Sequence, residues 1–513
     1  MNLRKNYVVA LGTAVALMLT ACGEDGGGGG RPSTVDFKDI SYHIPDGVEV
    51  DDSKAGSESK LLTTSDDESV AGFFKTEDTQ VNQKSSLKNG KAYGEKLYSK
   101  INNSSFDFGT LSLLSSQKIT SPHIYTVSHY KVVTYTAMKP LELSEKILYK
   151  LSGKTDIESL NSSESSEASK EFRLIYVEGV YKGVEFQVAS VVAESKYEEN
   201  EHICTSMTNG ARVTAKDATV TDNSQDFTAK AGNKKADFLF VVDDSGSMSN
   251  DQDALSKSAS DFTTEMGRSG LTYRSAIITT SYQPSGSYYH WDVNHILDEV
   301  GIIEDNEELL KEKLVAGTNG SNTETGIYNA EQALLSTDEG DSKDGEVTQL
   351  GMPLNDATLS VIIISDEPSQ YRYRAGKTFD VLDNLFIKRN IRVYSIIEPY
   401  GSNGSFDPNN YSQYDDLAYE TGGTIADIGN TNSDGELDYS EIMKQIAKDA
   451  GGAASTFVLE HPAISVNEVI ISGRAVKNSA TNGYTYNQSS NSIVLHGNAL
   501  PESDFTIKVN YTY

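Results

Sequence analysis

Cysteine is almost absent from this chain, which has only Cys22 and Cys204 among 513 residues. A disulfide framework is therefore excluded as the source of its stability. Positive charge is also scarce, with 44 Lys and Arg against 74 Asp and Glu and a formal net charge of −30. Nucleic acid is not expected as a partner, because phosphate contacts need a basic surface. After residue 21 no apolar run reaches the roughly 18 residues that a membrane span needs.

The usual signatures of an enzyme are missing as well. The eight histidines are scattered, and no Gly-x-Ser-x-Gly turn is present to carry a nucleophile. The glycine run at 26–30 follows no predicted strand and precedes no Lys-Ser/Thr pair, so it is not a phosphate loop. We therefore predict that the protein is not an enzyme.

The first residues have the pattern of an export signal. Residues 1–21 combine a basic start with an apolar run of about a dozen residues, too short for a typical membrane span. The segment ends in Leu19-Thr20-Ala21-Cys22, which resembles the lipobox of bacterial lipoproteins and implies lipid attachment at Cys22. The alternative is an ordinary secretory signal with a chance cysteine. Residues 22–35 follow as a Gly-rich tether. The residue after Cys22 is Gly23 and not the Asp that resembles an inner-membrane retention signal, which favours the outer membrane in a two-membrane bacterium.

The remaining sequence divides into three regions by pattern. Residues 36–233 carry no motif and read as an α+β region of unknown role, with strands expected at 119–138 and 172–193. Residues 234–450 alternate strands and helices, which predicts an α/β domain with a doubly wound, mostly parallel sheet. In residues 451–513 apolar residues recur at every second position, which predicts a small all-β module. We expect this module to begin near Gly451-Gly452-Ala453-Ala454.

The most informative stretch follows the apolar run 238–242, which predicts a buried parallel strand. Immediately after it come Asp243, Ser245 and Ser247 at alternate positions. Open α/β sheets bind ligands beyond the carboxyl ends of their strands, and hard divalent cations prefer such oxygen side chains. On its own, Asp243 also suits a helix N-cap.

This stretch matches the Asp-x-Ser-x-Ser signature of the von Willebrand factor A (vWA) family. Residues 320–327 resemble the second motif of that family, with Ser321 supplying the hydroxyl and Thr323 as the alternative. Residues 362–368 resemble the third motif, with Asp366 at the acidic position, although Ser365 and Glu367 replace the usual Thr and Gly. The resemblance implies a vWA sheet with helices on both faces and a metal-ion-dependent adhesion site. The implied metal ligands are Asp243, Ser245, Ser247, Ser321 and Asp366.

Two carboxylates and three hydroxyls suit Mg²⁺ and would accept Mn²⁺. Zinc is not expected, because no His or Cys occurs in these motifs. A second cation site is suggested by residues 430–441, which fit the twelve-residue EF-hand calcium loop. Its candidate Ca²⁺ ligands are Asn430, Asn432, Asp434, Glu436, Asp438 and Glu441. The alternative is a surface turn in which Asp438 and Glu441 form a capping box for the following helix.

These observations predict a protein of the cell envelope that is anchored to a membrane by a lipid on Cys22. The vWA site would bind a protein ligand, or a glycan as the second choice, through an acidic group that completes the metal's coordination. The runner-up is a scaffold lipoprotein of an envelope assembly, in which the metal mainly stabilises the fold.

Overall fold

The computed structural model describes residues 33–56, 58–64, 69–78, 108–152, 168–229, 234–268, 270–282, 292–354, 357–398, 413–432, 434–480, 482–499 and 505–513. Pro32–Tyr513 form one compact unit. The expected signal peptide, the lipidation residue Cys22 and most of the Gly-rich tether lie outside the described residues. The fold is mixed α/β, with helices packed on a large mixed sheet.

One half of this sheet is built from parallel strands in the order β14-β13-β12-β15-β16-β17, with only the edge strand β14 antiparallel. The bounds are β12 (Lys234–Val242), β13 (Leu271–Thr279), β14 (Ile303–Glu304), β15 (Ala357–Ser365), β16 (Arg392–Ile397) and β17 (Thr424–Asp427). The order along the chain runs outward from β12 in both directions, as in a doubly wound sheet.

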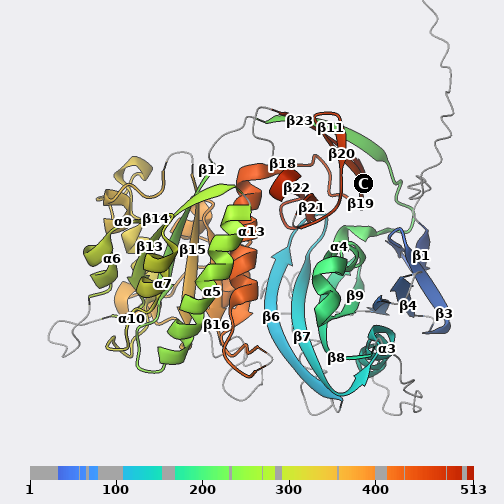
Figure 1. Cartoon of the computed structure of the whole chain (residues 1–513), viewed down its shortest axis with the longest axis horizontal. Coiled ribbons are helices and arrows are strands. Elements are labelled where there is room, and N and C mark those ends of the chain that lie inside the picture. Colours follow the sequence, from blue (N-terminus) through green and yellow to red (C-terminus); the bar gives the residue numbers. More distant parts are fainter. Residues whose placement is uncertain are drawn as a thin grey trace, which may run out of the picture. The chain divides into compact units, whose positions relative to one another are not determined.

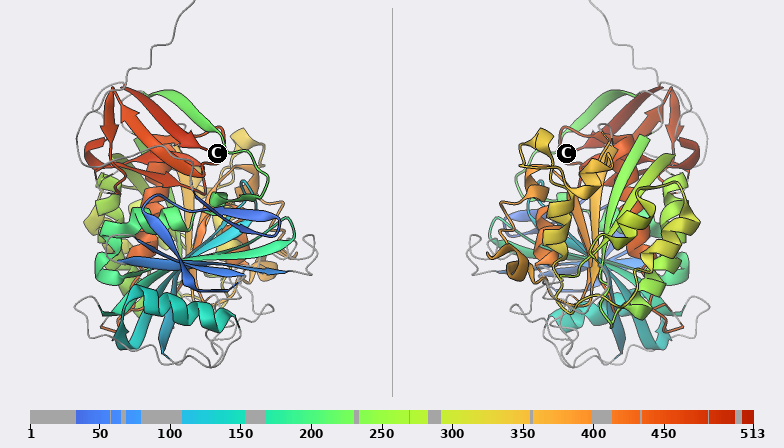
Figure 2. Two further views of the ribbon diagram at one scale, coloured as in Figure 1. Left: turned by 90° about the vertical axis from the view of Figure 1, so that its right-hand side faces the viewer. Right: turned by 90° about the vertical axis from the view of Figure 1, so that its left-hand side faces the viewer.

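Helices cover both faces of these strands because successive apolar side chains point to opposite sides. Phe238, Phe240 and Val242 pack in one core with α5, α7 and α13, whereas Leu239 and Val241 pack in another core with α8 to α12. Figure 1 shows α5 beside α13, and the right-hand view of Figure 2 shows helices on both sides of the strands. The bounds are α5 (Ser249–Arg268), α6 (His295–Val300), α7 (Glu307–Leu314), α8 (Gly326–Ala333), α9 (Glu346–Gln349), α10 (Tyr371–Ala375), α11 (Leu385–Lys388), α12 (Tyr414–Glu420) and α13 (Ser440–Ser455).

The sheet continues into the N-terminal region, because β17 pairs antiparallel with β6. From there the order is β6-β7-β8-β9-β5-β4-β3, all antiparallel. Helices α3 and α4 cover its two faces, and a small sheet, β1-β2-β10, packs on the α4 side. The bounds are β1 (Thr34–Phe37), β2 (Ile40–His43), β3 (Val48–Gly56), β4 (Ser59–Thr64), β5 (Val70–Asp78), β6 (Gly109–Ile119), β7 (Tyr125–Met138), α3 (Pro140–Leu151), β8 (Ser169–Tyr181), β9 (Val184–Ala193), α4 (Tyr197–Met207) and β10 (Val213–Ala215).

The last strands of the chain form two small antiparallel sheets around a shared core. One has the order β11-β23-β19-β20 and the other β18-β22-β21. The bounds are β11 (Asp222–Ala229), β18 (Thr456–Val458), β19 (Ser465–Ile471), β20 (Arg474–Val476), β21 (Tyr484–Asn487), β22 (Ser492–Leu495) and β23 (Phe505–Thr512).

Two details differ from the pattern expected from sequence. Strand β11 belongs by sequence to the region 36–233, yet it pairs along its whole length with β23, as Figure 1 shows. The four residues at 451–454, expected to separate two regions, lie inside α13. Burial of Ala447 and Ala450 against the core favours continuing the helix, and tertiary packing outweighs the roughly 1 kcal/mol that each helical glycine costs.

Candidate metal centre

The candidate centre lies where two neighbouring parallel strands end. Strand β12 pairs with β15 so that Val242 is opposite Ile364, and the Asp243 N–H donates to the Ile364 carbonyl at 2.9 Å. Asp243 and Asp366 therefore leave the sheet at the same edge. The structure thus brings together the acidic residues of the first and third motifs.

The Asp243 side chain is fully buried and held in place by its neighbours. One carboxylate oxygen accepts from the Ser245 N–H at 2.8 Å, and the other accepts from the Ser365 hydroxyl at 2.6 Å. The Gln252 side chain in α5 donates to the Asp243 carbonyl at 2.7 Å. The Ser245 and Ser247 hydroxyls lie 3.1 Å apart, with Ser247 exposed. Hydrogen bonds therefore connect Asp243, Ser245 and Ser247 of the first motif with Ser365 of the third.

The second motif is folded tightly against the first. The Gly320 N–H donates to the Asp244 carbonyl at 2.8 Å, and a Cβ at Gly320 would lie only 2.4 Å from the Asp244 carboxyl carbon and the Ser281 hydroxyl. The Ser321 hydroxyl accepts from the N–H groups of Tyr282 and Thr323, both at 3.1 Å, and donates to the Thr323 carbonyl at 3.0 Å. Its hydrogen and both lone pairs are thus engaged by the protein.

A residue that sequence reasoning missed is Glu324, which lies one position after Thr323 in the same motif. Its side chain is fully buried, and one carboxylate oxygen accepts from the Thr280 hydroxyl. Its other oxygen is a buried atom without a hydrogen-bond partner among the described residues, as is one carboxylate oxygen of Asp244 and one of Asp366. Buried polar atoms are normally paired, so three such oxygens around one strand edge mark a place for a ligand. The feature of the sequence that could have identified Glu324 is an acidic residue inside the second motif.

Electrostatics at this edge favour a positive charge. Burial, together with the charge of Asp366, raises the pKa of Asp243 to about 7 against hydrogen bonds that lower it. Burial, followed by the charge of Asp243, raises the pKa of Glu324 to about 9. Burial also raises the pKa of Asp244 and of Glu367. Carboxylates crowded away from water repel one another, and a divalent cation is the group that relieves this repulsion.

The side chains at this edge fit a hard cation, because all of them offer oxygen. The part of the chain that the structure describes holds no cluster of three or more His, Cys, Asp or Glu arranged for a metal. Thr323, the alternative ligand to Ser321, is half-buried in the same loop.

The structure folds the loop expected at 430–441 back on itself, because the Asp438 N–H donates to the Asn430 carbonyl at 2.9 Å. The Asn432 side chain accepts from the N–H groups of Asp434 and Glu436, at 2.9 and 3.1 Å, and closes a tight turn. Asp438 accepts from the Ser440 N–H at 3.0 Å and caps α13. Asn430 stands before this turn with a buried side-chain oxygen.

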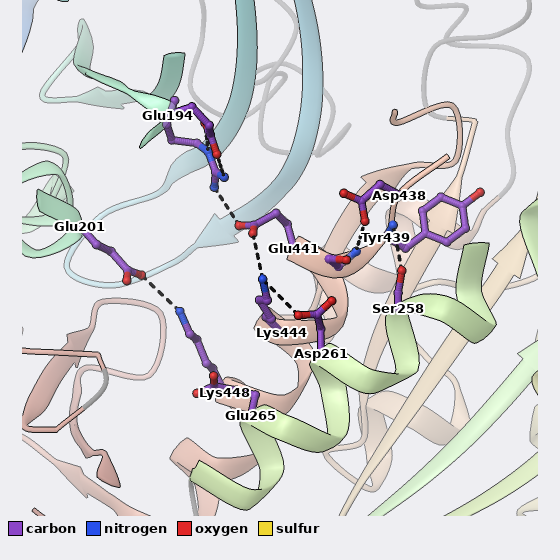
Figure 3. Close-up of polar contacts among 12 residues, drawn as sticks. Glu194, Glu201, Ser258, Asp261, Glu265, Asp438, Tyr439, Glu441, Lys444 and Lys448 are labelled. Carbon is purple, nitrogen blue, oxygen red and sulfur yellow. Dashed lines mark hydrogen bonds and ion pairs between the residues drawn. The ribbon is translucent and has the colours of Figure 1, made fainter. Parts of the chain in front are cut away.

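Glu441, the twelfth position of that loop, points elsewhere. Its carboxylate accepts from the Arg173 guanidinium of β8 at 2.9 Å and lies 3.7 Å from the Lys444 ammonium. Figure 3 shows Glu441 in this ion-pair network, apart from Asp438. The competing partner is 268 residues away in sequence, which explains why the local pattern alone suggested a calcium ligand. Glu441 likewise does not close a capping box with Asp438.

Comparisons with known proteins give fold-level similarities only. No model of a protein family matches the chain, and no curated protein matches it. Structural neighbours include von Willebrand factor type A from Catenulispora acidiphila (11% identity, 57% of this chain and 62% of that one, TM-score 0.25). They also include the pilus adhesin SpaC from Lactobacillus rhamnosus GG (11%, 67% and 41%, 0.29) and CyanoP from Synechocystis (9%, 38% and 98%, 0.25). At these TM-scores the similarity has no functional implication.

Two further observations concern the membrane and the remaining cysteine. Among the described residues, no helix is long and apolar enough to cross a membrane.

Cys204 is a free, fully buried thiol, and burial raises its pKa to about 12. Because the thiolate is the reactive form, burial disfavours reaction at Cys204.

Proposed function

We propose that this chain is a lipid-anchored cell-envelope protein that binds an acidic group of a protein ligand through a divalent cation. The observation that supports the cation site is the meeting of Asp243 and Asp366 at one strand edge, with unpartnered carboxylate oxygens around it. The lipid anchor at Cys22 and an outer-membrane location rest on the sequence pattern alone.

In this proposal Asp243, Ser245, Ser247 and Asp366 hold Mg²⁺ or Mn²⁺. The second motif contributes its oxygen through Ser321 or Thr323. The Ser321 hydroxyl already makes three hydrogen bonds, to Tyr282 and Thr323. Glu324, whose second oxygen has no hydrogen-bond partner among the described residues, would support the cation by its charge and not as a third carboxylate ligand. Once bound, the cation supplies a Lewis-acid position that a carboxylate of the partner can occupy.

The chain's own residues prepare this position. Ser365 and the Ser245 N–H orient the Asp243 carboxylate, and Gln252 fixes the backbone of Asp243 to Gly317 through bonds of 2.8 and 3.0 Å. Such supporting contacts set the affinity of a metal site by limiting how far its ligands can move. Ser247 is exposed, so the site opens to solvent on the side from which a partner would approach.

Calorimetric titration of Mg²⁺, Mn²⁺ and Ca²⁺ into residues 32–513 tests the proposal. We expect Mg²⁺ and Mn²⁺ to bind to the wild type and not to Asp243→Ala. Asp253→Ala is the matched control, because Asp253 is an exposed acid on α5. Absence of binding by folded wild type, or equal binding by Asp243→Ala, would contradict the cation site. If the metal raises the melting temperature but no acidic probe competes for it, the scaffold alternative is favoured.

A further inference from the structure

A basic segment lies directly beside the candidate metal centre. Helix α10 begins five residues after Asp366. The Gln370 N–H donates to the Glu324 carbonyl at 2.7 Å, and its side chain donates to the Glu367 carboxylate at 3.3 Å. The start of α10 is therefore fixed to the loops of both the second and the third motif.

One side of α10 is anchored and the other is free. Tyr371 is buried, its hydroxyl donates to Glu331 of α8 at 2.7 Å, and its ring packs against Phe379. With Tyr371 turned inward, Arg372, Tyr373 and Arg374 are left exposed, and Tyr373 retains 73% of its accessible surface. Aromatic side chains and Arg are enriched in protein interfaces relative to the rest of the surface.

Arg374 connects this segment to the second motif. Its guanidinium lies over the ring of Tyr282 at 4.9 Å and over that of Tyr328 at 5.4 Å. The Tyr282 N–H donates to the Ser321 hydroxyl at 3.1 Å. Tyr282 thus contacts both the Arg374 guanidinium and Ser321, a candidate metal ligand.

The segment differs in charge from the rest of this acidic chain. Residues 368–379 contain Arg372, Arg374 and Lys377 and no Asp or Glu. On neighbouring α11 and just after it, Lys388 pairs with Asp383 at 2.7 Å and Arg389 with Asp341 at 2.5 Å. By contrast, Arg372, Arg374 and Lys377 form no ion pair with any residue that the structure describes. The charge of Lys377 acts on Glu331 and Asp383, whereas Arg372 and Arg374 have no acidic partner among the described residues and can meet an external anion.

We infer that Arg372, Tyr373 and Arg374 with Tyr282, here called the α10 rim, bind an acidic segment of the partner protein next to the metal. This inference rests on the proposed function and specifies the chemistry of its ligand. One carboxylate of the partner takes the cation, and further carboxylates pair with the guanidinium groups, whose planar shape suits bidentate contacts. The basic rim also offsets the repulsion between an acidic partner and this acidic chain, which speeds association.

The test uses a fluorescent peptide of alternating Asp and Gly, with an Asn-Gly peptide as the neutral control, in the presence of Mg²⁺. We expect the wild type to prefer the Asp-Gly peptide and the double variant Arg372→Gln/Arg374→Gln to lose about tenfold in affinity, because two charge-assisted contacts are removed. Lys196→Gln/Lys216→Gln is the matched control, since it removes two exposed charges from the N-terminal region. It should change the affinity less than twofold.

Mg²⁺ titration of the same proteins separates this inference from the proposed function. The double variant should bind Mg²⁺ at least as well as wild type, because it lacks two nearby cations. If Mg²⁺ binds but the peptide affinity is unaffected by Arg372→Gln/Arg374→Gln, the rim inference is overturned while the metal site stands. If wild type binds no Mg²⁺, the proposed function falls. Heparin bound in place of the Asp-Gly peptide would also overturn the rim inference, since the ligand would then be a sulfated glycan.

Discussion

Replacement of Arg173 by Met should weaken the attachment of α13 to the N-terminal strands. Arg173 is 4% exposed, and its guanidinium donates to Glu194 at 2.6 and 3.2 Å and to Glu441 at 2.9 Å. It also lies over the Tyr197 ring at 4.3 Å. Methionine preserves the apolar stem but removes all of these interactions.

The expected loss is about 2–3 kcal/mol in the free energy of unfolding. Breaking a fully buried ion pair costs about 3–5 kcal/mol. The carboxylates of Glu194 and Glu441, which lose their partner in Arg173→Met, are 29% and 39% exposed. Hydration of these carboxylates therefore offsets part of that cost. Between Arg173 and Glu441 alone, a double-mutant cycle with Glu441→Gln should give a coupling of about 1 kcal/mol.

Acid sensitivity provides an independent readout of the same contact. Burial would raise the pKa of Glu441, but Arg173, followed by Lys444 and Lys448, lowers it to about 2. The unfolded chain, with a Glu pKa of about 4.3, binds the proton more readily. The contribution of Glu441 is therefore complete above about pH 5 and is lost as the pH falls toward 2. In Arg173→Met this acid-dependent loss should be smaller.

Urea unfolding followed by circular dichroism, at pH 7 and pH 4, measures both effects. The exposed Lys196→Met, whose pair with Glu199 is solvent-accessible, is the control and should change stability by less than about 0.5 kcal/mol. The reasoning would be refuted if Arg173→Met were as stable as this control, or if the cycle with Glu441→Gln showed no coupling.

Three further predictions concern the candidate metal centre. Gly320→Ala should destabilise the protein by about 1–3 kcal/mol through a clash with Asp244 and Ser281, whereas Gly246→Ala, where nothing lies within 4 Å, should not; thermal unfolding distinguishes them. Ser365→Ala removes a 2.6 Å bond to Asp243 and should weaken Mg²⁺ binding about 10–100-fold; calorimetric affinity equal to wild type would contradict this support. The pKa of Asp243, raised to about 7 from about 3.9 in the unfolded chain, predicts that metal-free protein loses stability as pH rises from 4 to 7. For the same reason Mg²⁺ should bind about 25-fold more tightly at pH 7.5 than at pH 5.5, and an affinity independent of pH would exclude the role of Asp243.

Much of the α/β part could be predicted because its signals are local. The run 238–242 forms the end of β12, as expected. A short continuous run of apolar residues favours a strand that is buried on both faces. The positions of Asp243 and Asp366 at the ends of two strands follow from the same patterns, since Asp243 directly follows an apolar run and Asp366 follows one after a single serine.

The pairing of distant segments could not be predicted in this way. Nothing near β17 indicates that its free edge pairs with β6, and nothing near Glu441 indicates Arg173 as its partner. Glu324 looked like one polar residue in a loop, and only the folded chain shows that its carboxylate is buried beside Asp243. Burial and electrostatic environment depend on which segments meet in space.

The sequence by itself determined the buried strand at 238–242, the alternation of strands and helices that follows it and the three oxygen-rich motifs, because hydrophobic period and turn residues act over a few neighbouring positions. Only the tertiary structure decided which of these oxygens have no hydrogen-bond partner among the described residues and which carboxylates repel one another. It also decided that Glu441 pairs with Arg173. Those outcomes are set by desolvation and by competing partners hundreds of residues away, which a local pattern does not contain.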